Sequence, residues 1–143
     1  MSPLLDTHAW IWWVDQDRRL GARTIAALDA LPGSDRPFIS DISLWEVAML
    51  VASGRLSLDI ALEDWLEAAA HPRSVRVLPI TPEIAAGVAA LAASFHRDPA
   101  DRILVATARA RKLPVVTHDR RIRSSRLVKL WRPVRKSRES RGD

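Results

Sequence analysis

Cysteine is absent from this chain of 143 residues, and no apolar run is long enough to cross a lipid bilayer. The absence of cysteine excludes a disulfide framework and any metal site built on thiolates. The absence of a long apolar run and of a cleavable signal predicts a cytoplasmic protein that does not enter membranes. Hydrophobic residues make up 48% of the chain, which favours a folded globular domain over a disordered chain.

Charge is distributed unevenly along the chain. Residues 1–108 carry 9 basic and 14 acidic side chains, whereas residues 109–143 carry 13 basic and 3 acidic ones. A basic end on an acidic body suggests a polyanionic partner that approaches from that end. For residues 132–143 the alternative is a solvated, disordered tail, because residues 136–143 contain no apolar side chain that could anchor them.

Short apolar runs alternate with helical patterns. Five strands are expected, at residues 3–5, 37–39, 74–78, 113–117 and, as the weakest, 127–130. Helices are expected at about 9–14, 24–31, 41–52, 60–70, 82–95 and 99–111, with caps at Ser40 or Asp41, Asp59, Thr81 and Asp98. This alternation predicts one α/β domain over residues 1–130, with a parallel sheet of four to five strands between helices on both faces, followed by a basic extension over 131–143. The tryptophans are expected to fill the core.

Four acidic residues stand where this order of elements would bring distant parts of the chain together. Asp6 and Asp119 each follow a predicted strand. Glu46 lies in an almost wholly apolar helix that we expect to be largely buried, and Asp101 lies at the top of the core-facing stripe of another. Taken singly, each has an ordinary explanation as a helix cap, an ion-pair partner of an arginine or a turn residue. Taken together they converge, because the carboxyl ends of parallel strands share one edge of a sheet.

Carboxylates gathered at one edge repel one another, by about 4 kcal/mol for two unit charges roughly 4 Å apart at an effective dielectric constant of 20. A bound cation or protonation relieves that repulsion. Oxygen ligands without cysteine or a repeated histidine pattern select a hard cation, so the expected ion is Mg²⁺ or Mn²⁺. Such a site can clamp a phosphodiester during an in-line displacement, and a basic surface beside it would attract the polyanion.

Four motifs resemble those of PIN-domain endoribonucleases, in particular the VapC-type toxins of bacterial toxin–antitoxin pairs. Within residues 3–125 they are LLDTH from Leu4, ISDISLWE from Ile39, DPADRILVATA from Asp98 and VTHD from Val116. The resemblance implies a PIN-like three-layer α/β/α fold and an endoribonuclease, dependent on Mg²⁺ or Mn²⁺, that hydrolyses RNA phosphodiester bonds. It implies catalytic and metal-binding roles for an acidic quartet, namely Asp6, Glu46, Asp101 and Asp119.

Residues beside this quartet acquire supporting roles from the same resemblance. Thr7, Ser43 and Thr117 would hold the carboxylates in place, while Asp98 would assist through a water or serve only as a helix cap. The candidates for RNA contacts are Arg102, Arg120, Arg121 and Arg123. The resemblance further implies a homodimer and a complex with a VapB-type antitoxin that occupies the groove.

Two other classes of function fit parts of the pattern. A non-catalytic PIN-like module would bind RNA or the ribosome through basic residues 109–136 without cleavage, although the complete quartet argues against it. An aspartate-nucleophile phosphatase would need a second acid two residues after the first, where this chain has His8. We interpret His8, His96 and His118 as ordinary surface or capping histidines.

Overall fold

At the centre of the computed structural model, which describes residues 1–133, is a parallel sheet with the strand order β3-β2-β1-β4. Its strands are β1 (Leu4–Leu5), β2 (Phe38–Ser40), β3 (Arg76–Leu78) and β4 (Val115–Val116). Leu4 is in register with Phe38 on one side and with Val115 on the other. The prediction of four parallel strands is therefore confirmed.

The weakest predicted strand, 127–130, is wrong as a strand and reduces to one bridge. Leu130 forms an isolated parallel bridge to Val115. The N–H of Val115 donates to Lys129 O at 2.8 Å, and its carbonyl accepts the N–H of Trp131 at 2.8 Å. Because β4 is only two residues long, residues 127–130 have no further strand backbone beside them to pair with.

The helices within the described residues follow the strands in the expected order. They are α1 (Thr7–Val14), α2 (Ala22–Asp29), α3 (Asp41–Ala52), α4 (Leu62–Ala69), α5 (Pro82–Ala90), α6 (Pro99–Arg111) and α7 (Arg120–Ser125), with 3-10 turns at Arg18–Leu20 and Gly33–Asp35. Ser40, Thr81 and Asp98 cap α3, α5 and α6, because their side-chain oxygens accept backbone N–H groups of the first turns.

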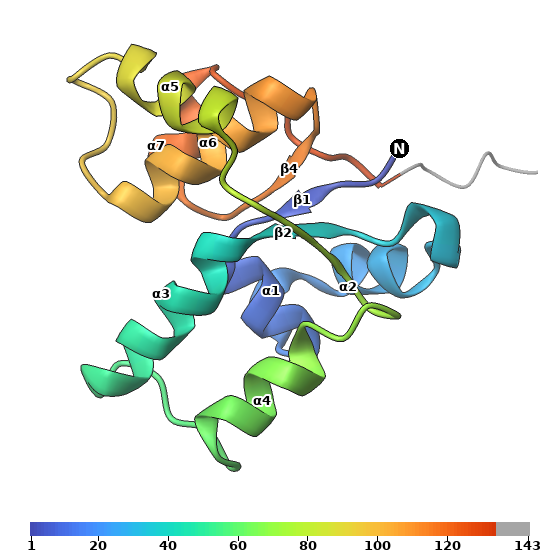
Figure 1. Cartoon of the computed structure of the whole chain (residues 1–143). Helices are drawn as coiled ribbons and strands as arrows, with labels where there is room; N and C mark the ends of the chain where they lie inside the picture. The colour runs from blue at the N-terminus through green and yellow to red at the C-terminus, as the bar shows by residue number, and fades with distance from the viewer. Residues whose placement is uncertain (134–143) are drawn as a thin grey trace, which may run out of the picture.

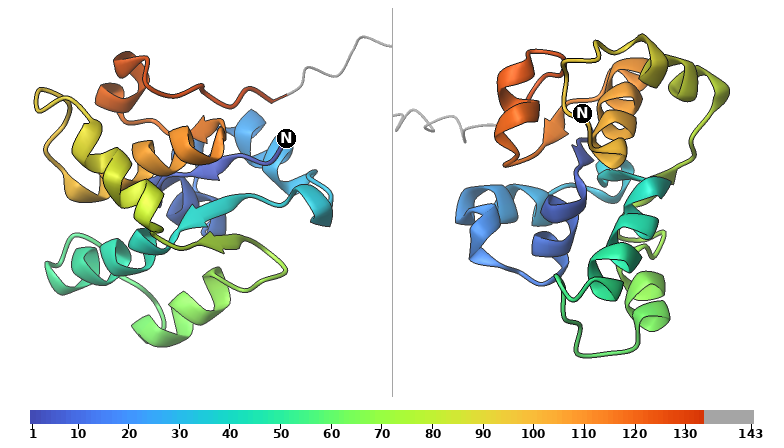
Figure 2. Two further views of the ribbon diagram at one scale, coloured as in Figure 1. Left: turned by 45° about the horizontal axis from the view of Figure 1, so that its top comes forward. Right: turned by 90° about the vertical axis from the view of Figure 1, so that its left-hand side faces the viewer.

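Helices cover both faces of the sheet, so the predicted three-layer α/β/α arrangement is confirmed (Figures 1 and 2). Alternate strand residues point to opposite faces. Leu4 and Val115 pack with apolar side chains of α6 and α7, whereas Leu5 and Val116 pack with those of α1 to α4. In Figure 1, α5, α6 and α7 lie above the strands and α1 to α4 lie below them.

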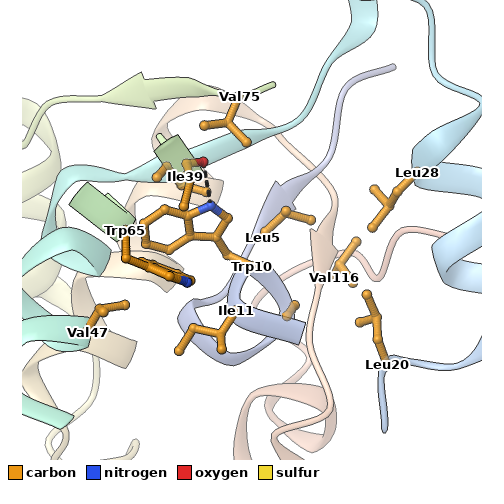
Figure 3. Close-up of a cluster of buried hydrophobic side chains, with 12 residues drawn as sticks. Leu5, Trp10, Ile11, Leu20, Leu28, Ile39, Val47, Trp65, Val75 and Val116 are labelled. Atoms are coloured by element: carbon orange, nitrogen blue, oxygen red, sulfur yellow. Dashed lines mark hydrogen bonds between the residues drawn. The ribbon is translucent and has the colours of Figure 1, made fainter. Parts of the chain in front are cut away.

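The larger core is built around two tryptophans (Figure 3). Trp10 is fully buried, and its indole N–H donates to the carbonyl of Ala69 at 3.1 Å. The ring of Trp65 meets it edge to face at 5.2 Å between centroids, a favourable geometry for aromatic pairs. The expectation of core tryptophans is confirmed for these two and is wrong for Trp45, which is 52% exposed.

Several expected helix boundaries differ from those of the structure, and one helix was not expected. Helix α4 begins at Leu62 with Ala61 as its N-cap, so Asp59 is not a cap; Glu63 and Asp64 supply negative charge to its first turn instead. Helix α7 follows Asp119 where no helix was expected. Helix α5 ends at Ala90 and not near Phe95.

Arg102 explains the early end of α5. Its Nη1 and Nη2 groups donate to five carbonyls at distances of 3.0 to 3.3 Å, those of Val88, Leu91, Ala92, Phe95 and His96. A side chain from α6 therefore satisfies carbonyls that a longer α5 would have paired with its own N–H groups. The chain from Leu91 to Asp98 therefore forms a loop and not a continuation of the helix.

The expectation that the helix at 41–52 is largely buried is wrong. Of its residues only Ser43 and Val47 are buried, whereas Trp45 and Met49 are exposed. No helix among residues 1–133 is long and apolar enough to cross a membrane. Trp131, at the start of the predicted extension, packs against the larger core, and residues 134–143 of that extension lie outside the described residues.

Candidate metal and catalytic site

Asp6 directly follows β1, at the carboxyl end of that strand. One carboxylate oxygen accepts the N–H of Ala9 at 2.7 Å, so Asp6 caps α1. The other accepts the hydroxyl of Thr117, which follows β4. The side chain is therefore fixed from two neighbouring strands, and the residue is only 7% exposed. Burial is the main cause that raises the pKa of Asp6 above its usual value.

Thr117 also connects Asp6 to Asp119. Its oxygen accepts the backbone N–H of Asp119 at 3.0 Å. The carboxylate of Asp119 in turn caps α7 by accepting the N–H groups of Arg121 and Ile122, at 2.9 and 3.1 Å. One buried threonine thus fixes the relative positions of two acids.

Glu46 projects from the second turn of α3 beside two buried hydroxyls. Thr7 Oγ1 and Ser43 Oγ are hydrogen-bonded at 2.9 Å across α1 and α3, and Ser43 is one turn before Glu46. Burial raises the pKa of Glu46, and hydrogen bonding from Thr7 partly offsets that effect. Among residues 1–133 no lysine or arginine pairs with Glu46 within 4.0 Å, so the alternative of a structural ion pair is not supported.

Asp98 and Asp101 lie at the start of α6. The Oδ1 atom of Asp98 accepts the N–H of Asp101 at 3.1 Å, which confirms Asp98 as the N-cap. Asp101 Oδ2 lies 2.7 Å from His96 Nε2, and the same nitrogen lies 3.8 Å from Asp119 Oδ2. His96 thus stands between two acids of the quartet.

All four acids of the quartet line one cleft at the carboxyl edge of the sheet, with a volume of about 640 Å³. The other residues that line it are Thr7, His8, Trp12, His96, Asp98, His118, Arg120 and Arg121. A larger hollow of about 800 Å³ adjoins it and shares His96 and Arg121. Acids that are up to 113 positions apart in the sequence therefore line the same cleft.

The electrostatics of the cleft show how closely the acids approach one another. The pKa of Asp101 is raised to about 8, first by burial and then by the negative charges of Asp98, Asp119, Glu46 and Asp6. A carboxyl with such a pKa holds a proton at neutral pH unless a cation compensates the charge. The cleft therefore carries more negative charge than its surroundings stabilise.

Two of the four arginines predicted to contact RNA lie at the cleft. Arg120 and Arg121 line it. Arg102 instead closes the loop after α5 through its five carbonyl bonds, and Arg123 donates to the carbonyl of Thr117 at 3.0 Å. The structure gives Arg102 and Arg123 positions that suit a structural role and not contact with a ligand in the cleft.

The donor set fits a hard divalent cation. Asp101, Asp119 and His96 present ligand atoms that lie within 4.8 Å of one another, and Asp6 and Glu46 add carboxylates to the same cleft. Carboxylate oxygens are the preferred ligands of Mg²⁺ and Mn²⁺. A cation would also relieve the repulsion that raises the pKa of Asp101.

His96 is the residue of this site that sequence reasoning missed. The sequence predicts an ordinary surface or capping histidine. Its Nδ1 does accept the backbone N–H of Asp98, but its side chain is only 10% exposed and its Nε2 contacts Asp101. The available signal was its place two residues before Asp98-Pro99, the start of α6. His118 has the ordinary role expected of it, because its Nε2 donates to Leu20 O at 2.9 Å.

Comparison with known proteins gives consistent matches over most of the chain. The family model for the PIN domain matches residues 4–126. Ribonuclease VapC22 from Mycobacterium tuberculosis is 41% identical over 123 residues, which make up 86% of this chain and 91% of that protein.

Solved structures share the fold at lower identity. A toxin–antitoxin complex from Klebsiella pneumoniae matches with a TM-score of 0.63 and 24% identity, over 89% of this chain and 95% of the matched chain. VapBC2 from Rickettsia felis, bound to a DNA fragment from its promoter, matches with a TM-score of 0.68 and 13% identity, over 92% and 98%.

Proposed function

Because this chain belongs to the PIN-domain family, we propose that it is a VapC-type endoribonuclease toxin that hydrolyses RNA phosphodiester bonds with Mg²⁺ or Mn²⁺. The observation that carries the proposal is the meeting of Asp6, Glu46, Asp101 and Asp119 in one cleft, with the pKa of Asp101 raised to about 8. A merely structural cluster of acids would have cationic partners. Among the residues described, the cleft's arginines are Arg120 and Arg121, and neither forms an ion pair within 4.0 Å with an acid of the quartet.

Each part of the cleft has a task in this proposal. The four acids hold the cation, and Thr117 and the cap at Asp98 hold the acids. When bound, the cation supplies charge neutralisation and Lewis-acid activation for in-line displacement at phosphorus. Arg120 and Arg121 attract the phosphate backbone of the substrate, which the negative cleft alone would repel.

An antitoxin of VapB type is the proposed partner. The matched structure from Klebsiella pneumoniae is described as a toxin–antitoxin complex and the one from Rickettsia felis as VapBC2, which supports this assignment. The homodimer implied by the resemblance and the cytoplasmic location expected from the sequence stay predictions.

Incubation of the purified protein with total RNA in Mg²⁺, Mn²⁺ or EDTA tests the proposal. We expect discrete cleavage products with either metal and none with EDTA. Asp6→Asn and Asp119→Asn should abolish cleavage and leave the fold intact, because asparagine retains the capping function of each aspartate. Asp59→Asn, at an exposed acid outside the cleft, is the matched control and should cleave like the wild type.

Two results would contradict the proposal. Cleavage by Asp6→Asn at the wild-type rate would show that the quartet is not catalytic. Salt-sensitive RNA binding that needs no metal and yields no product would favour the non-catalytic binding module.

A further inference from the structure

His96 lies on the loop between α5 and α6 and faces two acids of the quartet. Its Nε2 atom is 2.7 Å from Asp101 Oδ2 and 3.8 Å from Asp119 Oδ2. Two roles are compatible with these distances. His96 could ligate a cation directly through Nε2, or it could donate a hydrogen bond from Nε2–H to Asp101. The two roles require the ring proton on different nitrogens.

The surroundings of the other ring nitrogen distinguish the two roles. Nδ1 of His96 accepts the backbone N–H of Asp98 at 3.2 Å, and Nη1 of Arg121 lies 3.3 Å from it. A backbone N–H and a guanidinium can only donate, so Nδ1 carries a lone pair. The neutral ring then has its proton on Nε2, where it points to Asp101. In this tautomer Nε2 has no lone pair for a metal ion.

We propose that His96 is a positioning residue that orients the Asp101 carboxylate toward the cation through a hydrogen bond from Nε2–H, and is not itself a metal ligand. The proposal rests on the proposed function in that Asp101 must bind the cation. Carboxylates that ligate metals are commonly held by such outer hydrogen bonds, and loss of one lowers metal affinity by about 10- to 100-fold.

Asp98 then has two connected tasks. Its side chain accepts the N–H of Asp101, and its own N–H fixes the ring of His96. The side chain of Asp101 is thus held from the imidazole while its backbone is held by the helix cap. This double attachment suits an acid that is repelled by all its acidic neighbours.

Titration calorimetry of Mn²⁺ binding to the full chain tests this role with three substitutions. His96→Leu removes the donor and should weaken binding about 10- to 100-fold. His96→Gln retains an amide N–H near the position of Nε2 and should recover most of the affinity. His96→Glu places an acceptor against Asp101 and should bind no better than His96→Leu, whereas a direct ligand could be replaced by a carboxylate.

His71 offers a matched control. Its Nδ1 likewise accepts the backbone N–H two residues later, that of Arg73 at 3.1 Å, but the residue is exposed and lies outside the cleft. His71→Leu should leave Mn²⁺ affinity unchanged. Urea denaturation in EDTA checks that each variant is folded. If a variant does not fold, its binding result is left out and the spectroscopic test on the wild type decides.

Two-bond ¹H–¹⁵N spectra of the imidazoles provide that test without a substitution. The Nε2–H tautomer is expected for His96 in EDTA and in saturating Mg²⁺, and a change to Nδ1–H with Mg²⁺ would overturn the proposal. Tight Mn²⁺ binding by His96→Glu, or equal binding by the wild type and His96→Leu, would overturn it as well. Failure of the wild type to bind Mn²⁺ would instead overturn the proposed function on which it rests.

Discussion

Replacing Asp101 with asparagine removes the charge that the metal-free cleft accommodates least well. The pKa of Asp101 is about 8 in the folded protein, against 3.8 for an unperturbed aspartate. Between these values the folded state binds a proton that the unfolded state has released, so the stability contributed by this group is complete below about pH 4 and is lost as pH rises to about 8. The wild type in EDTA should therefore become less stable from pH 5 to pH 8.

The size of this effect has an upper limit. Over the three pH units from 5 to 8, one proton held by the folded state alone lowers the free energy of unfolding by at most about 4 kcal/mol, at about 1.36 kcal/mol per pH unit. The side chain is 21% exposed and the cleft is open, so water and counterions reduce the repulsion. We expect about 2 to 3 kcal/mol to be measurable. Asp101→Asn should lose most of this pH dependence and should be more stable than the wild type at pH 8.

Urea denaturation in EDTA at pH 5, 6, 7 and 8, followed by the fluorescence of the buried Trp10 and Trp65, measures the difference. Asp59→Asn provides the control for an exposed acid and should behave like the wild type. Saturating Mg²⁺ should restore stability to the wild type at pH 8 and have less effect on Asp101→Asn. A wild type whose stability is constant or rises from pH 5 to pH 8 in EDTA would refute the reasoning.

Other contacts make further predictions. Thr117→Val leaves the buried carboxylate of Asp6 without its hydroxyl donor and the backbone N–H of Asp119 without its acceptor. The free energy of unfolding in EDTA should fall by about 1 to 3 kcal/mol, and Thr117→Ser should stay close to the wild type. Arg102→Lys cannot form all five hydrogen bonds to the carbonyls. It should lower the free energy of unfolding by about 2 to 3 kcal/mol and speed amide hydrogen exchange over residues 88–97. Arg121→Ala should weaken binding of a non-cleavable RNA and lower its salt slope by about 0.7; an unchanged slope would place RNA elsewhere.

The fold and the meeting of the acids follow from local patterns in the sequence. Apolar pairs such as Leu4-Leu5 and Val115-Val116 indicate buried strands, and in a parallel sheet the residues after them must share an edge. The caps at Ser40, Thr81 and Asp98 are equally local, since a cap bonds only to the next turn. These features were predictable because residues adjacent in the sequence mark each strand and each cap, although the strands then pair with distant ones, as Leu4 does with Val115.

The features that sequence reasoning missed depend on distant partners. The path of residues 91–98, and with it the place of His96, is set by the carbonyl bonds of Arg102 from α6. The exposure of Trp45 depends on which face of α3 has a neighbour, and an apolar window alone does not reveal that. The expected strand at 127–130 had the right composition, but β4 offers it one residue to pair with.

The acids of the cleft also build the fold that carries them. Asp6, Asp98 and Asp119 are the N-caps of α1, α6 and α7, so each carboxylate is placed by the same hydrogen bonds that start its helix. The positive end of each helix dipole stabilises the negative charge, which offsets part of the repulsion in the metal-free state. Alanine at these positions would remove a cap as well as a charge, at a cost of about 1 kcal/mol. Asparagine caps a helix as well as aspartate does, and only this substitution separates the chemical role of each acid from its role in folding.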